Sequence, residues 1–115
     1  MSNKIAVLVS GGGRSLENLA SLQSSGELSA ELSLVISNKA GAYALERASR
    51  LNIPSLVIDP ERALSPEQFS ERAFQEISAA GCQLVVLAGF LRYLPIPSGW
   101  EGRVLNIHPS LLPAF

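Results

Sequence analysis

The residue types best suited to chemistry stand close together in one segment, where Asn106 and His108 are separated by a single residue. Side chains alternate along a strand, so a strand over 103–108 projects both of them to one face. Such a pair sets a neutral hydrogen-bond donor beside a group that titrates near neutral pH. Pro109 ends the strand, which places the pair at its carboxyl end, where open α/β sheets bind ligands. A core histidine with its hydrogen bonds satisfied, beside a strand asparagine, is the alternative that these residues leave open.

A glycine turn is the second candidate site, because Gly11, Gly12 and Gly13 lie between the first predicted strand and the first predicted helix. Glycines let the backbone approach an anion closely, and amides at a helix start carry partial positive charge. Arg14 adds a cation that can bind phosphate through two hydrogen bonds. The turn matches neither the GxGxxG fingerprint, since Leu16 stands at its last position, nor a P-loop. The pattern predicts a phosphate site, with a tight turn that binds nothing as the alternative.

A third candidate is the loop 89–94, which follows the fourth predicted strand. An apolar loop with backbone groups at the carboxyl end of a strand suits a flat heterocycle that is partly apolar and partly hydrogen-bonding. Simple core packing by Phe90 and Leu94 is the alternative. Lys39 is expected to be a solvated surface charge, while Trp100 either caps the core or lines a pocket.

The elements that must position these residues are short apolar runs alternating with amphipathic segments. This order is typical of βαβ units and predicts a doubly wound α/β fold with a mostly parallel, Rossmann-like sheet and right-handed crossovers. The third helix is signalled by a capping box at Ser65 and Gln68, with Pro66 at the first helical position. The predicted strands cover 4–10, 32–37, 55–58, 83–88 and 103–108, and the predicted helices cover 14–25, 42–51 and 66–80.

Composition narrows the class of protein. The 115 residues suit one domain, and 47% hydrophobic with 17% charged residues is typical of a globular chain. A formal net charge of −1 gives no electrostatic reason to expect a nucleic-acid partner. The single cysteine, Cys82, fits a reducing compartment. With no apolar run approaching the roughly 18 residues of a membrane span, we expect a cytoplasmic protein without a membrane partner.

Several sequence blocks together resemble the N-terminal part of the phosphoribosylglycinamide formyltransferase family, the folate-dependent transformylases of purine biosynthesis. The matching blocks are 9–13 (VSGGG), 36–40 (ISNKA), 45–48 (LERA), 87–92 (LAGFLR) and 105–113 (LNIHPSLLP). The last block is highly specific to folate formyltransferases. Its proline after the histidine, with the early glycine turn, favours this family over methionyl-tRNA formyltransferase or the formyltetrahydrofolate deformylase. The resemblance implies that 1–115 is the N-terminal part of a single formyltransferase domain, truncated after the fifth strand.

The resemblance also implies a reaction and its binding residues. A formyl group would pass from 10-formyltetrahydrofolate, the co-substrate, to the amine of glycinamide ribonucleotide. Both substrates are small molecules, and no metal is implied. The substrate phosphate would bind the backbone amides of Gly13, Arg14 and Ser15. The residues implied for the folate, largely through backbone groups, are Leu91, Arg92, Tyr93, Leu94 and Asn106.

Catalysis would fall to Asn106 and His108. Attack of the amine on the formyl carbon creates a tetrahedral oxyanion, which the asparagine amide and a protonated histidine would stabilise, the histidine also moving protons. The family's glycine turn usually continues with Ser or Thr and then Asn, where this sequence has Arg14 and Ser15. The family's third catalytic residue, an aspartate that orients the histidine, would fall beyond Phe115.

Two other functions remain as alternatives: a truncated, non-catalytic domain that binds a phosphorylated ligand, and a related folate enzyme such as formyltetrahydrofolate deformylase. A strand order of 3-2-1-4-5, if the sheet adopts it, also has a consequence for partners. It leaves the fifth strand as an exposed apolar edge, which predicts self-association through that edge.

Overall fold

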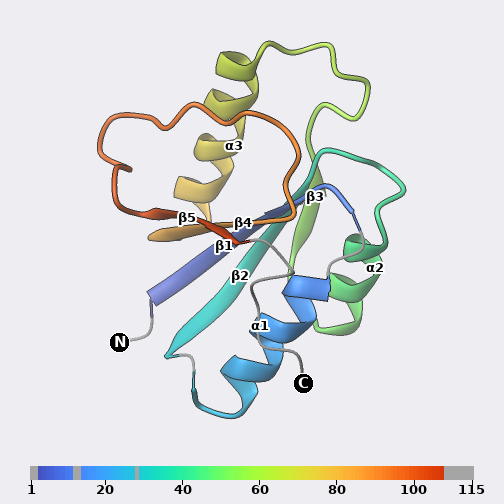
Figure 1. Ribbon diagram of the computed structural model, residues 1–115, viewed down its shortest axis with the longest axis vertical. Coiled ribbons are helices and arrows are strands. Elements are labelled where there is room, and N and C mark those ends of the chain that lie inside the picture. Colours follow the sequence, from blue (N-terminus) through green and yellow to red (C-terminus); the bar gives the residue numbers. More distant parts are fainter. Residues whose placement is uncertain (1–2, 12–13, 28, 108–115) are drawn as a thin grey trace.

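The computed structural model describes residues 3–11, 14–27 and 29–107. Five parallel strands form one sheet in the order β3-β2-β1-β4-β5 (Figure 1). The strands are β1 (Asn3–Val9), β2 (Ala30–Ser37), β3 (Ser55–Val57), β4 (Leu84–Ala88) and β5 (Val104–Ile107). The predicted parallel sheet is confirmed, and the sheet adopts the strand order that leaves β5 at an edge.

Helices cover both faces of the sheet, with α1 (Arg14–Ser24) and α2 (Tyr43–Arg50) on one face and α3 (Pro66–Ala79) on the other (Figure 1). The central strand β1 shows why both faces need cover. Leu8 packs into the apolar cluster on the α3 side, whereas Val7 and Val9 pack into the cluster formed with α1 and α2. The sequence of a strand that is buried on both faces is a nearly continuous apolar run, and residues 5–9 have such a sequence.

The start of α3 confirms the capping box. The Ser65 hydroxyl accepts the Gln68 backbone N–H at 3.1 Å, and the Gln68 side-chain oxygen accepts the Ser65 N–H at 2.9 Å. Phe69, Ala73 and Ile77 are buried, as their helical spacing predicts, and Phe74 is buried beside them. The helix therefore presents a continuous apolar stripe to the sheet.

Element bounds differ from the predicted ones by one or two residues, most visibly in β2 and β3. β2 begins at Ala30 because this residue pairs with Asn3 at the start of β1. β3 is short because it pairs only with Val35–Ser37 of β2.

None of the helices in the described part of the chain is both long and apolar enough to cross a bilayer.

Candidate functional site

The carboxyl ends of β1 and β4 meet at the centre of the sheet, where the crossover direction changes. β1 pairs with β2 on one side and with β4 on the other. The chain leaves β1 toward α1 on one face, whereas the helix that precedes β4 is α3 on the opposite face (Figure 1). Open α/β sheets bind ligands in the crevice at such a switch point. Gly11, the loop after β4 and the last residues of β5 follow the strands at this edge of the sheet.

Ser10 connects the two central loops of this edge. It is buried directly after β1, and its hydroxyl oxygen accepts the backbone N–H of Leu91 at 2.9 Å. The carbonyl of the next residue, Gly11, accepts the N–H of Ala44 in α2 at 3.2 Å. The start of the glycine turn is therefore tied both to the loop after β4 and to the second helix.

The loop after β4 divides its side chains between core and solvent. Phe90 and Leu94 are buried in the cluster on the α3 side, which agrees with the core-packing alternative for these two positions. Leu91 and Tyr93 are each 73% exposed. Within the described residues, the backbone groups of 92–94 make no hydrogen bond. The loop thus offers open backbone donors and acceptors next to exposed apolar side chains.

Arg92 turns away from this exposed surface and enters a buried ion pair. Its Nη1 donates to Asp59 Oδ2 at 2.9 Å, and the two side chains are only 12% and 3% exposed. Its Nη2 donates to the carbonyl of Leu64 at 3.2 Å, and the guanidinium lies 4.5 Å from the centre of the Phe69 ring. Two hydrogen bonds and a cation–π contact fix this side chain in one orientation.

Asp59 is fully engaged as an acceptor. Besides Arg92, it accepts the backbone N–H of Ala63 at 2.7 Å and of Leu64 at 3.1 Å. Burial by itself raises the pKa of this carboxyl, but the hydrogen bonds from Arg92 and from the two backbone donors outweigh it, so the pKa lies below its ordinary value. The group is a carboxylate that holds its neighbours, not an acid available to a substrate.

Asn106 lies on β5, in register with Leu87 of β4, and its side chain is exposed. Val104 packs toward the α3 side, and Ile107 packs toward the α1 and α2 side. By strand alternation, Asn106 shares the face of Val104 and lies opposite Ile107. The exposed position is that of a group available to a ligand, not of a core asparagine. His108 lies outside the described residues.

The predicted phosphate residues are described only in part. Arg14 is exposed at the first position of α1, where helix amides without intrahelical partners point outward. Gly13 and the side chain of Ser15 lie outside what the structure describes.

Lys39 is exposed, as expected of a solvated charge. Trp100 packs with its ring centre 5.1 Å from that of Phe74, and so it caps the α3 side of the core.

Three buried polar residues at this edge were missed by the sequence interpretation, namely Ser10, Asp59 and Asn38. The partners of Ser10 and Asp59 lie far along the chain, so no local pattern marks them. Asn38 continues the β2 ladder, donating its N–H to the carbonyl of Val9 at 3.4 Å. Its side-chain nitrogen and oxygen are buried and have no hydrogen-bond partner in the described part of the chain. The one sequence signal for Asn38 is a polar residue directly after an apolar strand, where a buried side chain would need hydrogen-bond partners.

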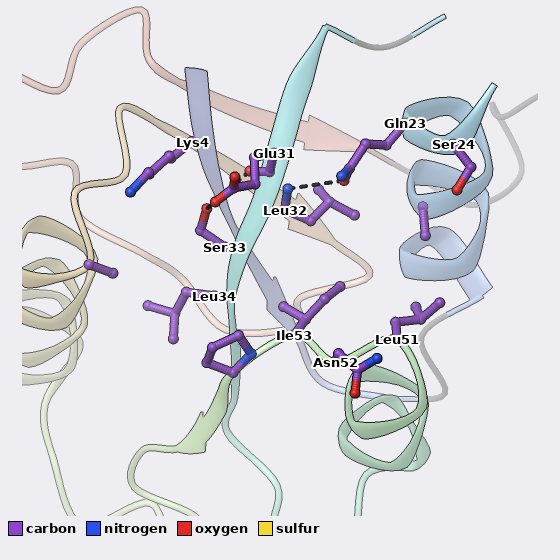
Figure 2. A pocket seen from close by; sticks show the side chains of 13 residues that line it. Lys4, Gln23, Ser24, Glu31, Leu32, Ser33, Leu34, Leu51, Asn52 and Ile53 are labelled. Carbon is purple, nitrogen blue, oxygen red and sulfur yellow. Dashed lines mark hydrogen bonds between the residues drawn. The ribbon is translucent and has the colours of Figure 1, made fainter. Parts of the chain in front are cut away.

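A hollow of about 580 Å³ lies at the opposite end of the sheet (Figure 2). It surrounds the first residues of β2, with Lys4 and Leu34 on one side and Gln23 and Ile53 on the other (Figure 2). The Gln23 side-chain oxygen already accepts the backbone N–H of Leu32 at 3.1 Å. The hollow lies at the amino end of the sheet, away from the candidate residues at the carboxyl edge.

Comparison with known proteins identifies the family of the chain. Residues 3–115 match the family model described as formyl transferase. The chain is 44% identical over 114 residues to the trifunctional purine biosynthetic protein adenosine-3 of Gallus gallus, covering 97% of this chain and 11% of that protein. It is 37% identical over 114 residues to phosphoribosylglycinamide formyltransferase of Haemophilus influenzae, covering 97% of this chain and 54% of that enzyme.

Solved structures give the same result. Glycinamide ribonucleotide transformylase 1 from Geobacillus kaustophilus superposes with a TM-score of 0.86 at 34% identity, over all of this chain and 62% of that one. Phosphoribosylglycinamide formyltransferase from Coxiella burnetii superposes with a TM-score of 0.83 at 40% identity, over all of this chain and 55% of that one. The chain thus spans little more than half the length of these single-activity relatives. The family model covers nearly all of it, and the chain belongs to the formyl transferase family.

Proposed function

We propose that residues 1–115 are the N-terminal part of a single formyltransferase domain that transfers a formyl group from 10-formyltetrahydrofolate to the amine of glycinamide ribonucleotide, a step of purine biosynthesis. The observation that carries the proposal is the carboxyl edge of the sheet. There a partly buried hydrogen bond from Leu91 to Ser10 joins the start of the glycine turn to a loop with open backbone groups. The exposed Asn106 stands on the strand next to β4. The names of the relatives point to the same reaction.

For the phosphorylated substrate, we propose binding at the start of α1. The phosphate accepts from the backbone amides of Gly13, Arg14 and Ser15, which the helix dipole favours. The Arg14 side chain, exposed at this helix start, adds a fixed positive charge. The bond between Gly11 and Ala44 supports this role, because it braces the turn against α2.

For the folate co-substrate, we propose the loop 91–94, with Asn106 at its side. The pterin ring has one edge of alternating donors and acceptors and two apolar faces. The open N–H and C=O groups of 92–94 suit the edge, and the exposed Leu91 and Tyr93 side chains suit the faces. The Arg92 side chain is not a folate ligand in this proposal, because Asp59 already holds it.

The chemistry follows from these positions. The substrate amine attacks the formyl carbon, a new C–N bond forms, and the carbonyl oxygen becomes an oxyanion that accepts hydrogen bonds from the Asn106 amide and a protonated His108. Collapse of the intermediate breaks the bond from the formyl carbon to N10 of the folate. The proton lost by the amine goes, through His108, to N10. Donors set in place before the reaction lower the barrier because they need no reorganisation.

The test uses the full-length protein with both substrates, and products are followed by mass spectrometry. The proposal predicts formylated glycinamide ribonucleotide and tetrahydrofolate in equal amounts. Release of formate at the same rate without the amine substrate would indicate the deformylase reaction instead. Binding of both ligands with neither product formed would indicate a non-catalytic binding domain.

A further inference from the structure

We propose that Asp59 is a positioning residue for the folate side of the site, acting through Arg92. The inference rests on the proposed function, because it assigns a role to the loop that receives the folate. Asp59 is the one aspartate in the sequence and stands 33 residues before the arginine that it binds. It touches no group that reacts, so its effect on the reaction is indirect.

The argument begins with how the loop after β4 is held. Side-chain hydrogen bonds tie it to the rest of the described chain at three positions, 91, 92 and 95, and Arg92 makes two of them. Ser10 accepts from the N–H of Leu91 at 2.9 Å, Asp59 accepts from the side chain of Arg92 at 2.9 Å, and Ser70 donates to the carbonyl of Pro95 at 2.5 Å. The Asp59 tie is the ionic one. It lies beside the backbone groups of 92–94, which make no hydrogen bond to any other described residue.

The loop 59–64 is shaped to make this carboxylate an anchor. Asp59 and Arg62 have left-handed backbone conformations, with φ of 52° and 57°. This conformation is costly for most residues and is tolerated best by Gly, Asn and Asp. It brings the N–H groups of Ala63 and Leu64 onto the two carboxylate oxygens. The loop thus fixes Asp59, and Asp59 in turn fixes Arg92.

The effect of this chain of contacts should be confined to one substrate. Arg92 lies between the exposed Leu91 and Tyr93, so a shift of its side chain moves the backbone on which the pterin would rest. The glycine turn has its own supports in Ser10 and in the bond from Ala44 to Gly11. Asp59 contacts neither support in the described residues. Its loss should weaken folate binding and leave nucleotide binding intact.

The main variant is Asp59→Asn, which keeps the size of the side chain and its tolerance of the left-handed conformation. The amide retains one acceptor oxygen and turns a donor toward either Arg92 or a backbone N–H, so the three donors are no longer all satisfied. We expect KM for 10-formyltetrahydrofolate to rise by about 10–10²-fold, the range expected when a binding group is displaced by about 1 Å. We expect KM for the nucleotide to change less than about twofold.

Two further variants keep the test decisive. Glu61→Gln removes an exposed carboxylate from the same loop and should leave both KM values unchanged. Arg92→Lys keeps the charge, but its ammonium cannot donate to Asp59 and to the Leu64 carbonyl in the same geometry. It should therefore reproduce the folate effect. In the double variant Asp59→Asn with Arg92→Lys, the two effects should not multiply, because both act through one contact.

Three outcomes would overturn the proposal. One is a folate KM within about twofold of the wild type at a temperature where circular dichroism shows the Asp59→Asn variant folded. Another is an equal rise in both KM values, which would indicate a general structural role. A third is full multiplication of the two effects in the double variant.

A separate measurement distinguishes this failure from failure of the proposed function. If the wild type transfers no formyl group, the Kd for tetrahydrofolate is measured by calorimetry for the wild type, Asp59→Asn and Glu61→Gln. A weaker Kd in Asp59→Asn alone would support the positioning role without the transferase activity. Equal Kd values, or no binding by the wild type, would overturn it.

Discussion

Replacing Ser10 with alanine tests how the two halves of the site are joined. The substitution deletes the hydroxyl that accepts the Leu91 N–H at 2.9 Å across 81 residues of sequence. An ordinary hydrogen bond contributes roughly 0.5–1.5 kcal/mol net, and an unsatisfied buried donor costs roughly 1–3 kcal/mol. Ser10 is buried and Leu91 lies at the surface, so we expect a loss of about 1–2 kcal/mol in the free energy of unfolding.

The assay is urea unfolding of the full-length protein followed by circular dichroism, with an unchanged m-value as the sign that only stability has changed. Ser33→Ala is the matched control, because its hydroxyl donates to the exposed Glu31 carboxylate at the other end of the sheet. The control should stay within about 0.5 kcal/mol of the wild type. Ser10→Ala should also raise KM for both substrates. A Ser10 variant as stable as the Ser33 control, with both KM values unchanged, would refute the reasoning.

Three other predictions concern charge and the sheet edge. Arg14→Ala should raise KM for the nucleotide by about tenfold with little change in kcat, because a loss of this size corresponds to one charge-assisted hydrogen bond. The control Arg72→Ala, on the exposed face of α3, should leave KM unchanged. Equal KM values for the two variants would show that Arg14 does not bind the phosphate. Because the pKa of Asp59 is lowered by folding, its contribution to stability is present above about pH 4 and is lost as pH falls through the folded pKa. The difference in unfolding free energy between the wild type and Asp59→Asn should therefore shrink in acid, and a constant difference from pH 7 to pH 3 would contradict this. The 115-residue chain should self-associate through β5, where Leu105 is 54% exposed. Leu105→Lys should keep the chain monomeric in sedimentation velocity. A wild-type chain that is monomeric at all concentrations would contradict self-association through that edge.

The strands, the helices between them and the start of α3 could be predicted because their signals are local. The run 5–9 is apolar at every position, and the capping box at Ser65 and Gln68 needs only four consecutive residues. The projection of Asn106 and Ile107 to opposite faces also follows from alternation along a strand. Local patterns of this kind are sufficient to outline the layers of a doubly wound fold.

The supports of the site could not be predicted, because they depend on contacts between distant segments. Arg92 looked like a ligand residue from its place in the loop, and only the fold shows its guanidinium pairing with Asp59 beneath that loop. Asp59 and Arg62 both have left-handed backbone in this loop, which the sequence around them does not predict. The acceptor role of Ser10 likewise depends on β4 lying beside β1.

The most direct test of the central claim is the rate of formyl transfer by Asn106→Ala under single-turnover conditions, with saturating 10-formyltetrahydrofolate and nucleotide. Asn3→Ala, which alters an exposed asparagine at the amino end of β1, is the control. If the Asn106 amide stabilises the oxyanion, its loss should lower the rate by about 10²–10³-fold while the control keeps the wild-type rate. A near-normal rate in a folded Asn106→Ala protein would contradict the placement of the reaction at this edge of the sheet.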